Sequence, residues 1–143
     1  MFDGASKGNP GNAGGGGILL DASSRLLLSY AWGLGPTSNN NAEFLALWQG
    51  LNQAKALKLS KLTVIGDARV IIHACSQRKR SKNFLLNKIY KKILFQAKDF
   101  ESITFYHVLR SLNYLAHHEA NVGASLSKGI IITNGNERYC PIH

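Results

Sequence analysis

The chain opens with Phe2-Asp3-Gly4-Ala5-Ser6-Lys7-Gly8-Asn9-Pro10-Gly11, which runs on into Gly14-Gly15-Gly16-Gly17. In this stretch Asp3 is expected at the end of a strand, and a segment rich in Gly and Pro follows it. Such a loop lets the backbone approach a ligand closely, because glycine tolerates positive φ and has no side chain to collide with a phosphate or sugar. A Gly-rich stretch is more often an ordinary turn, so it indicates a site only if other residues converge on Asp3.

Length and composition predict one compact globular domain. The chain has 143 residues, 45% of them hydrophobic and 17% charged, and no apolar run approaches the roughly 20 residues that a membrane helix needs. The N-terminus lacks the pattern of a signal peptide, and the cysteines are Cys75 and Cys140. We therefore expect an intracellular monomer without membrane contact, with a domain over residues 1–128 and a frayed tail over 129–143.

The charge distribution predicts a nucleic-acid partner. Seventeen Lys and Arg against eight Asp and Glu give a formal net charge of +9, which attracts phosphate backbones. A solvated helix face would explain the later lysines of the basic segment, and its first three residues could instead be a nuclear-import signal. The segment from Gln77 to Lys98 has no acidic residue and carries Arg78, Lys79, Arg80, Lys82, Lys88, Lys91, Lys92 and Lys98.

Hydrophobic periodicity predicts an α/β fold. Two antiparallel strands at the start, followed by alternating helices and strands, imply a mixed sheet whose later strands are parallel. Apolar residues Leu112, Leu115, Ala116, Val122 and Leu126 outline one face of the last helix, on which Glu119 stands against the pattern. The expected strands cover 18–20, 26–32, 62–65 and 103–108, and the expected helices begin near 42 and cover 68–76, 86–97 and 112–126.

Three acidic residues are expected to meet at one edge of this sheet. Asp3 and Asp67 each follow a predicted strand, and Glu43 lies in the first turn of the helix that begins near Ala42. Ligands on such sheets gather at the carboxyl ends of strands. Three converging carboxylates repel one another unless a divalent cation neutralises them, so the arrangement predicts a Mg²⁺ site.

Four motifs in order resemble those of a known family: residues 3–11, Asn39-Asn40-Asn41-Ala42-Glu43, Gly66-Asp67 and His107-Val108-Leu109-Arg110-x-x-Asn113. From Phe2 to about Leu126 the chain resembles a type 1 ribonuclease H domain, of the reverse-transcriptase-like kind common in plants. The resemblance implies a mixed five-stranded sheet of order 3-2-1-4-5 with helices on both faces. It also implies an endonuclease that hydrolyses the RNA strand of RNA–DNA hybrids.

The resemblance also implies roles for individual residues. Asp3 matches the carboxylate that bridges two metal ions, and Glu43 and Asp67 match two further ligands. Two Mg²⁺ ions about 4 Å apart would activate a water and stabilise the leaving 3′ oxygen. His107 matches a family histidine that assists proton transfer or product release, although a strand-end histidine without catalytic duty is the alternative.

Further residues are implied to bind the hybrid. Asn9 and Asn39 match positions that contact its minor groove, where the 2′-hydroxyl distinguishes RNA from DNA. Turn and helix-cap roles for these asparagines are compatible with that function. From the basic segment, Arg78, Lys79, Arg80 and Lys82 are expected to contact phosphates, which position a duplex without reading its sequence.

The sequence departs from the family pattern at three places. His117 stands where the family's last motif has its fourth carboxylate, and Glu119 stands where the family usually has Leu. Because imidazole suits softer ions than Mg²⁺, a metal at His117 would favour Mn²⁺. Only Met1 and Phe2 precede Asp3, so the first strand is expected to be truncated.

Two other functions are compatible with these residues. A catalytically degenerate nucleic-acid-binding module, or a retroelement relic, would explain His117 and the short start. A DNA transposase or resolvase of the same fold is a further alternative. The asparagine motifs at 9–11 and 39–41 favour hybrid recognition over this last alternative.

Overall fold

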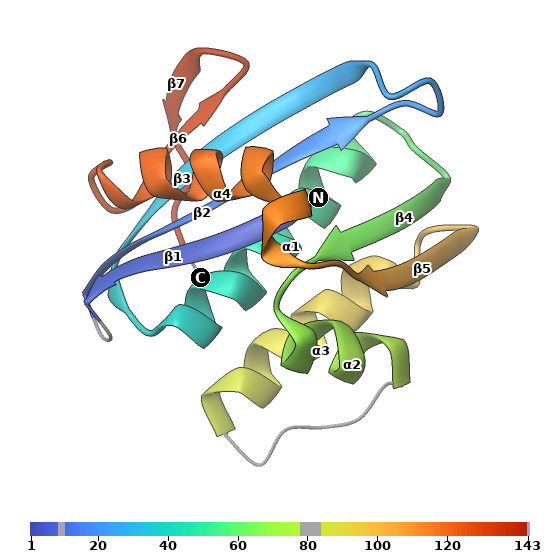
Figure 1. Cartoon of the computed structure of the whole chain (residues 1–143), viewed down its shortest axis with the longest axis horizontal. Coiled ribbons are helices and arrows are strands. Elements are labelled where there is room, and N and C mark those ends of the chain that lie inside the picture. The colour runs from blue at the N-terminus through green and yellow to red at the C-terminus, as the bar shows by residue number, and fades with distance from the viewer. Residues whose placement is uncertain (9–10, 78–83, 143) are drawn as a thin grey trace.

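A computed structural model describes residues 1–8, 11–77 and 84–142 of the chain (Figure 1). Over these residues the chain combines strands, α-helices and one 3-10 helix, and none of the helices in this part is long and apolar enough to cross a membrane. In chain order the elements are β1 (Phe2–Gly8), β2 (Gly11–Leu20), β3 (Leu26–Thr37), α1 (Asn39–Ala56), β4 (Lys61–Gly66), α2 (Arg69–Gln77), α3 (Phe84–Ala97), β5 (Ser102–His107), η1 (Arg110–Leu112), α4 (Tyr114–Ala124), β6 (Ile130–Thr133) and β7 (Asn136–Tyr139).

The Gly-rich opening forms strands, which corrects the expectation of a loop after Asp3. β1 pairs antiparallel with β2 along its whole length, from Phe2 opposite Gly17 to Gly8 opposite Gly11. β2 pairs in turn with β3, so the predicted hairpin is confirmed and is longer than expected. β1 therefore continues well past Asp3.

The expected strand order is confirmed in part. β3, β2 and β1 are neighbours, and β4 and β5 form the predicted parallel pair, but in the described residues β1 and β4 are not joined as neighbours in one ladder. Met1 and Ile18 exchange both backbone hydrogen bonds, so the backbone N–H and C=O of Phe2 point away from β2. The carbonyl oxygen of Phe2 accepts a hydrogen bond from Asn113 Nδ2 at 2.9 Å. This side-chain contact takes the place of a backbone hydrogen bond expected between β1 and β4.

The C-terminal residues also differ from expectation, because the expected frayed tail contains two strands. β6 pairs antiparallel with β3, and β7 pairs with β6. Asn134 and Gly135, between these strands, have positive φ values of 50° and 83°. An Asn-Gly pair between two strands is a strong hairpin signal, and it was present in the sequence. Ile131 of β6 is fully buried, which anchors the hairpin to the core.

Helices cover both faces of the antiparallel sheet, as expected, with α1 and α4 on opposite sides (Figure 1). Neighbouring residues of a strand point to opposite faces, and the glycines of β2 follow this alternation. A Cβ atom on Gly14 or Gly16 would overlap the backbone of α4, whereas one on Gly15 would lie 3.1 Å from Ala46 Cβ of α1. The glycines therefore allow both helices to approach the sheet closely.

The apolar face expected for the helix over 112–126 is wrong in part, and the close approach explains the error within α4. Leu112, which lies in η1, and Leu115 of α4 were expected on the buried face but are 62% and 45% exposed. A helix lying directly on glycine backbone has room only for small side chains beneath it. The buried positions of α4 are accordingly Ala116, Ala120, Gly123 and Ala124.

The main core lies between α1 and the sheet, and α3 packs on α1 (Figure 1). Ser38 caps α1 by accepting a hydrogen bond from the Asn41 backbone N–H. Tyr30 and Trp32 of β3 are fully buried beneath α1, and the Tyr30 hydroxyl donates to the Ala46 carbonyl at 2.6 Å.

Gly4→Ala tests the importance of the close approach between β1 and α1. Its Cβ would overlap the backbone of Ala42 and Glu43, so we expect a loss of about 1–3 kcal/mol in the free energy of unfolding. At this chain length the melting temperature would fall by roughly 3–10 °C. Gly15→Ala is the matched control, because its Cβ would come no closer than 3.1 Å to Ala46 and the change in unfolded-chain entropy is the same. Equal melting temperatures for the two variants would contradict the steric argument.

Candidate active site

Three carboxylates from three elements meet in one cluster. Asp3 is the second residue of β1 and only 1% exposed, Glu43 lies in the second turn of α1, and Asp67 directly follows β4. Their ligand oxygens all lie within 4.8 Å of one another, as expected from the sequence. Two local expectations are corrected: Asp3 is not at a strand end, and Glu43 is not in the first turn, because α1 begins at Asn39. The contact of Gly4 with the Glu43 backbone brings α1 to this edge of β1.

The electrostatics of the cluster favour a cation. Burial above all, and then the neighbouring carboxylates of Asp3 and Asp67, raise the pKa of Glu43 far above its ordinary range. Asp3 Oδ1 and Glu43 Oε2 are buried, and neither has a hydrogen-bond partner in the part of the chain that the structure describes. Leaving buried carboxylate oxygens unpaired is costly. A divalent cation that takes oxygen ligands would compensate this cost, so the residues present fit Mg²⁺ or Mn²⁺.

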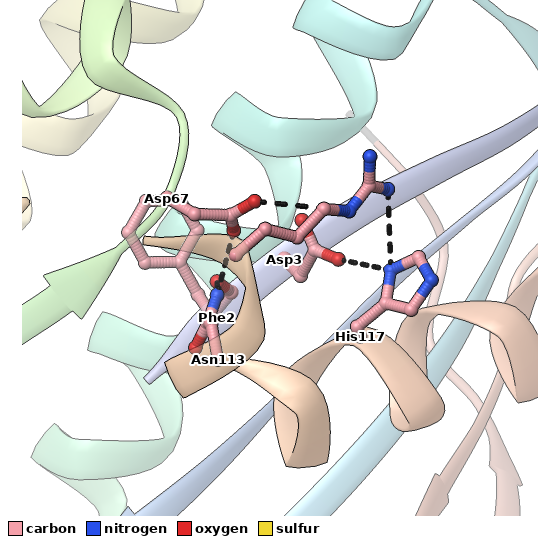
Figure 2. Close-up of polar contacts among 6 residues, drawn as sticks. Phe2, Asp3, Asp67, Asn113 and His117 are labelled. Atoms are coloured by element: carbon pink, nitrogen blue, oxygen red, sulfur yellow. Dashed lines mark hydrogen bonds and ion pairs between the residues drawn. The ribbon is translucent and has the colours of Figure 1, made fainter. Parts of the chain in front are cut away.

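Asn113 connects the cluster to the start of β1 (Figure 2). This side chain lies between η1 and α4 and is fully buried. Its Nδ2 donates to the Phe2 carbonyl at 2.9 Å and to Asp67 Oδ1 at 2.8 Å. Asn113 thus fixes the position of Asp67 relative to β1. The sequence offered a signal for this role, since a single asparagine interrupts the apolar stretch that opens the last helix.

His117 lies beside Asp3 (Figure 2), and it is not one of the residues of the carboxylate cluster. Its Nδ1 is 2.7 Å from Asp3 Oδ2. A carboxylate accepts hydrogen bonds, so this distance assigns the Nδ1 hydrogen to His117 as the donor. One oxygen of Asp3 is therefore held by His117, and the other faces the cluster without a partner among the described residues.

Arg110 of η1 brings a positive charge to the same place, and sequence reasoning did not assign it a role. Its Nε is 4.0 Å from Asp67 Oδ2, and its Nη2 is 3.4 Å from His117 Nδ1. Since that nitrogen already donates to Asp3, it cannot also accept from Arg110, and the second contact is not a hydrogen bond. The guanidinium is largely exposed, so it stands at the opening of the site.

Two other expected site residues, His107 and Asn39, are not part of the cluster. His107 ends β5, where it lies opposite Gly66 in the parallel register, and its side chain is half-buried. Asn39 is exposed at the first residue of α1. The remaining expected nucleic-acid contacts, Asn9, Arg78, Lys79, Arg80 and Lys82, lie outside the described residues.

The family of the chain follows from comparison with known proteins. The family model described as "Reverse transcriptase-like" matches residues 1–123, and the chain therefore belongs to this family. The bifunctional protein Rv2228c of Mycobacterium tuberculosis is 33% identical over 120 residues, which are 83% of this chain. The chain spans only a third of the length of that protein. Ribonuclease HI of Halobacterium salinarum is 33% identical over 70 residues, covering 49% of this chain and 35% of that protein.

Solved structures extend the similarity to the fold. The N-terminal RNase H domain of Rv2228c has a TM-score of 0.83 at 31% identity, covering 86% of this chain and 89% of that chain. RNase H1 of Halobacterium salinarum has a TM-score of 0.82 at 26% identity, covering 85% and 92%. LC11-RNase H1 in complex with an RNA/DNA hybrid has a TM-score of 0.81 at 26% identity, covering 86% and 93%. The chain thus has the mixed α/β fold of ribonuclease H, and its acidic cluster is consistent with a hydrolase of that type.

Asn113→Ala tests whether this residue positions Asp67. Without the amide, Asp67 is free to turn, and we expect Mn²⁺ binding to weaken about tenfold or more, as measured by titration calorimetry. The matched control is Gln53→Ala, which removes the buried amide that donates to Gln49 Oε1 at 3.1 Å. Both variants should be less stable than the parent, but only Asn113→Ala should bind metal more weakly. Unchanged Mn²⁺ affinity in Asn113→Ala would reduce its role to holding β1.

Proposed function

We propose that the chain is a metal-dependent endonuclease that hydrolyses the RNA strand of RNA–DNA hybrids. The observation that carries this proposal is the cluster of Asp3, Glu43 and Asp67, whose ligand oxygens lie within 4.8 Å of one another. The similarity to LC11-RNase H1, which was solved in complex with an RNA/DNA hybrid, supports the choice of substrate.

In this proposal each residue of the cluster has a separate task. Bound divalent cations would supply an activated water and would stabilise the leaving oxygen of the scissile phosphate. Asp3, Glu43 and Asp67 would hold these cations, with the open oxygen of Asp3 facing the cluster. Asn113 keeps Asp67 oriented, and His117 fixes the rotation of the Asp3 carboxyl group. Because these two contacts hold the Asp67 and Asp3 carboxyl groups in place, the site would need little rearrangement when the reaction occurs.

Residues around the cluster would hold the nucleic acid. Arg110 at the opening of the site would contact a phosphate of the RNA strand. Asn9 and Asn39 would contact the minor groove, and the basic residues 78–82 would bind the backbone of the hybrid through charge. His107, at the end of β5 beside Gly66, would assist proton transfer or product release.

A second function is favoured by the contact between His117 and Asp3. Because His117 occupies one oxygen of the central carboxylate, the site could hold too few ligands for turnover. The chain would then bind hybrid without cutting it. The two proposals make different predictions for the same assay.

The direct test is cleavage of a hybrid labelled in its RNA strand, in Mg²⁺ and in Mn²⁺. We expect metal-dependent cutting of the RNA strand that is abolished in Asp3→Asn, because this change removes the negative charge at the centre of the cluster. Circular dichroism would show that both samples are folded. Salt-sensitive binding of the hybrid without turnover, at high protein concentration and in either metal, would instead establish the binding module.

His117→Asp tests the account of the fourth ligand position. With histidine present we expect weak activity in Mg²⁺ and relatively better activity in Mn²⁺, because Mg²⁺ demands near-ideal octahedral coordination by oxygen and His117 supplies no oxygen ligand. A carboxylate at this place would add an oxygen ligand beside Asp3, so the Mg²⁺-dependent rate should rise about tenfold. His118→Asp, on the exposed side of the same helix, is the matched control and should give no gain. An unchanged rate in His117→Asp would show that a fourth carboxylate is dispensable here.

A further inference from the structure

An open cavity of about 420 Å³ lies between α1 and α3, apart from the carboxylate cluster. It is lined by Trp48 of α1 and by Lys91, Lys92, Phe95 and Gln96 of α3. Trp48 follows Glu43 by five residues, which corresponds to a rotation of about 140° around the helix axis. The two side chains therefore leave α1 on nearly opposite sides, and this cavity does not belong to the proposed active site.

The cavity combines aromatic rings with ammonium groups. Lys92 Nζ lies 5.5 Å from the centroid of the Trp48 ring, and Lys98 Nζ lies 4.1 Å from the centroid of the Phe95 ring. Trp48 also packs against Trp32, and the two ring centroids are 6.1 Å apart. The aromatic surfaces and the positive charges are thus presented together.

Phe95 is not needed for the core of the protein. The buried side of α3 is formed by Ile89, Tyr90 and Ile93, whereas Phe95 is 60% exposed. α3 has no acidic residue between 84 and 97. The nearby Asp99 is paired with Lys55 at 2.6 Å, and its charge also interacts with the adjacent Lys98.

We propose that this cavity binds a single-stranded segment of nucleic acid. Proteins that bind single strands combine a positively charged groove with aromatic side chains on which bases stack. Here the exposed ring of Phe95 would stack on a base, and Lys91 would lie near a phosphate. An acidic peptide would satisfy the lysine but offers no flat group for the Phe95 ring. In a duplex the bases are stacked on one another, so a single strand fits the exposed ring better.

The test uses the full chain and a fluorescently labelled dT oligonucleotide of about ten nucleotides, without divalent cations. Phe95→Ala should weaken binding, measured by anisotropy, about tenfold, which is the effect of removing the stacking of one base. Lys91→Ala should weaken binding and reduce the slope of log affinity against log salt by about 0.7, because one phosphate is no longer neutralised. The matched controls Val70→Ala and Lys61→Ala, an exposed apolar residue on α2 and an exposed lysine on β4, should bind as the parent does.

Two comparisons distinguish this site from general attraction of polyanions. An abasic oligonucleotide of the same length should bind more weakly than dT, and Phe95→Ala should not weaken it further. Equal affinity for dT and abasic strands, an equal loss of affinity in Lys61→Ala and Lys91→Ala, or equally tight binding of an oligoglutamate peptide would overturn the proposal. Binding of dT is measured without cleavage, so its outcome does not depend on whether the chain cuts hybrids. The rate of cleavage of a short blunt hybrid should be the same in Phe95→Ala as in the parent.

Discussion

The structure depends on the close contact of two helices with glycine backbone. Gly4 lets α1 approach β1 until the Glu43 backbone touches it, and Gly14 and Gly16 let α4 lie directly on β2. The first contact brings Glu43 beside Asp3. The second carries the start of α4, with Asn113 and His117, to the same edge of the sheet. The site is therefore assembled by positions that lack side chains, and a shift of one helix by the size of a methyl group would separate its carboxylates.

The local signals of the sequence predicted the parts of the fold that depend on neighbouring residues. The β2–β3 hairpin and the parallel pair β4–β5 follow from turn chemistry and periodicity. The Gly-rich strands could not be predicted in this way, because glycine has little intrinsic preference for strands and is explained here only by helices packed on both faces. Leu115 of α4 was misassigned to the buried face for the same reason, since periodicity does not report how close a helix comes to its sheet.

The sequence likewise predicted some contacts of the candidate site and not others. The order of the acidic residues predicted that Asp3, Glu43 and Asp67 would meet, and the structure brings them together. The sequence could not predict that the Asn113 side chain would donate to the Phe2 carbonyl, which was expected to pair with β4. This contact joins residues 111 positions apart. Nor could the sequence predict the bond from His117 to one oxygen of Asp3, which depends on the height of α4 above the sheet.

The hairpin of β6 and β7 also determines how the sheet ends. Among the described strands β7 pairs only with β6, and all four of its residues are exposed, so its outer edge offers free backbone groups to solvent. Glu137 and Arg138 place charges of opposite sign on this edge. Charged side chains on a short outer strand hinder the addition of a strand from another molecule. The hairpin thus protects the glycine-rich sheet from pairing with another molecule through its outer edge.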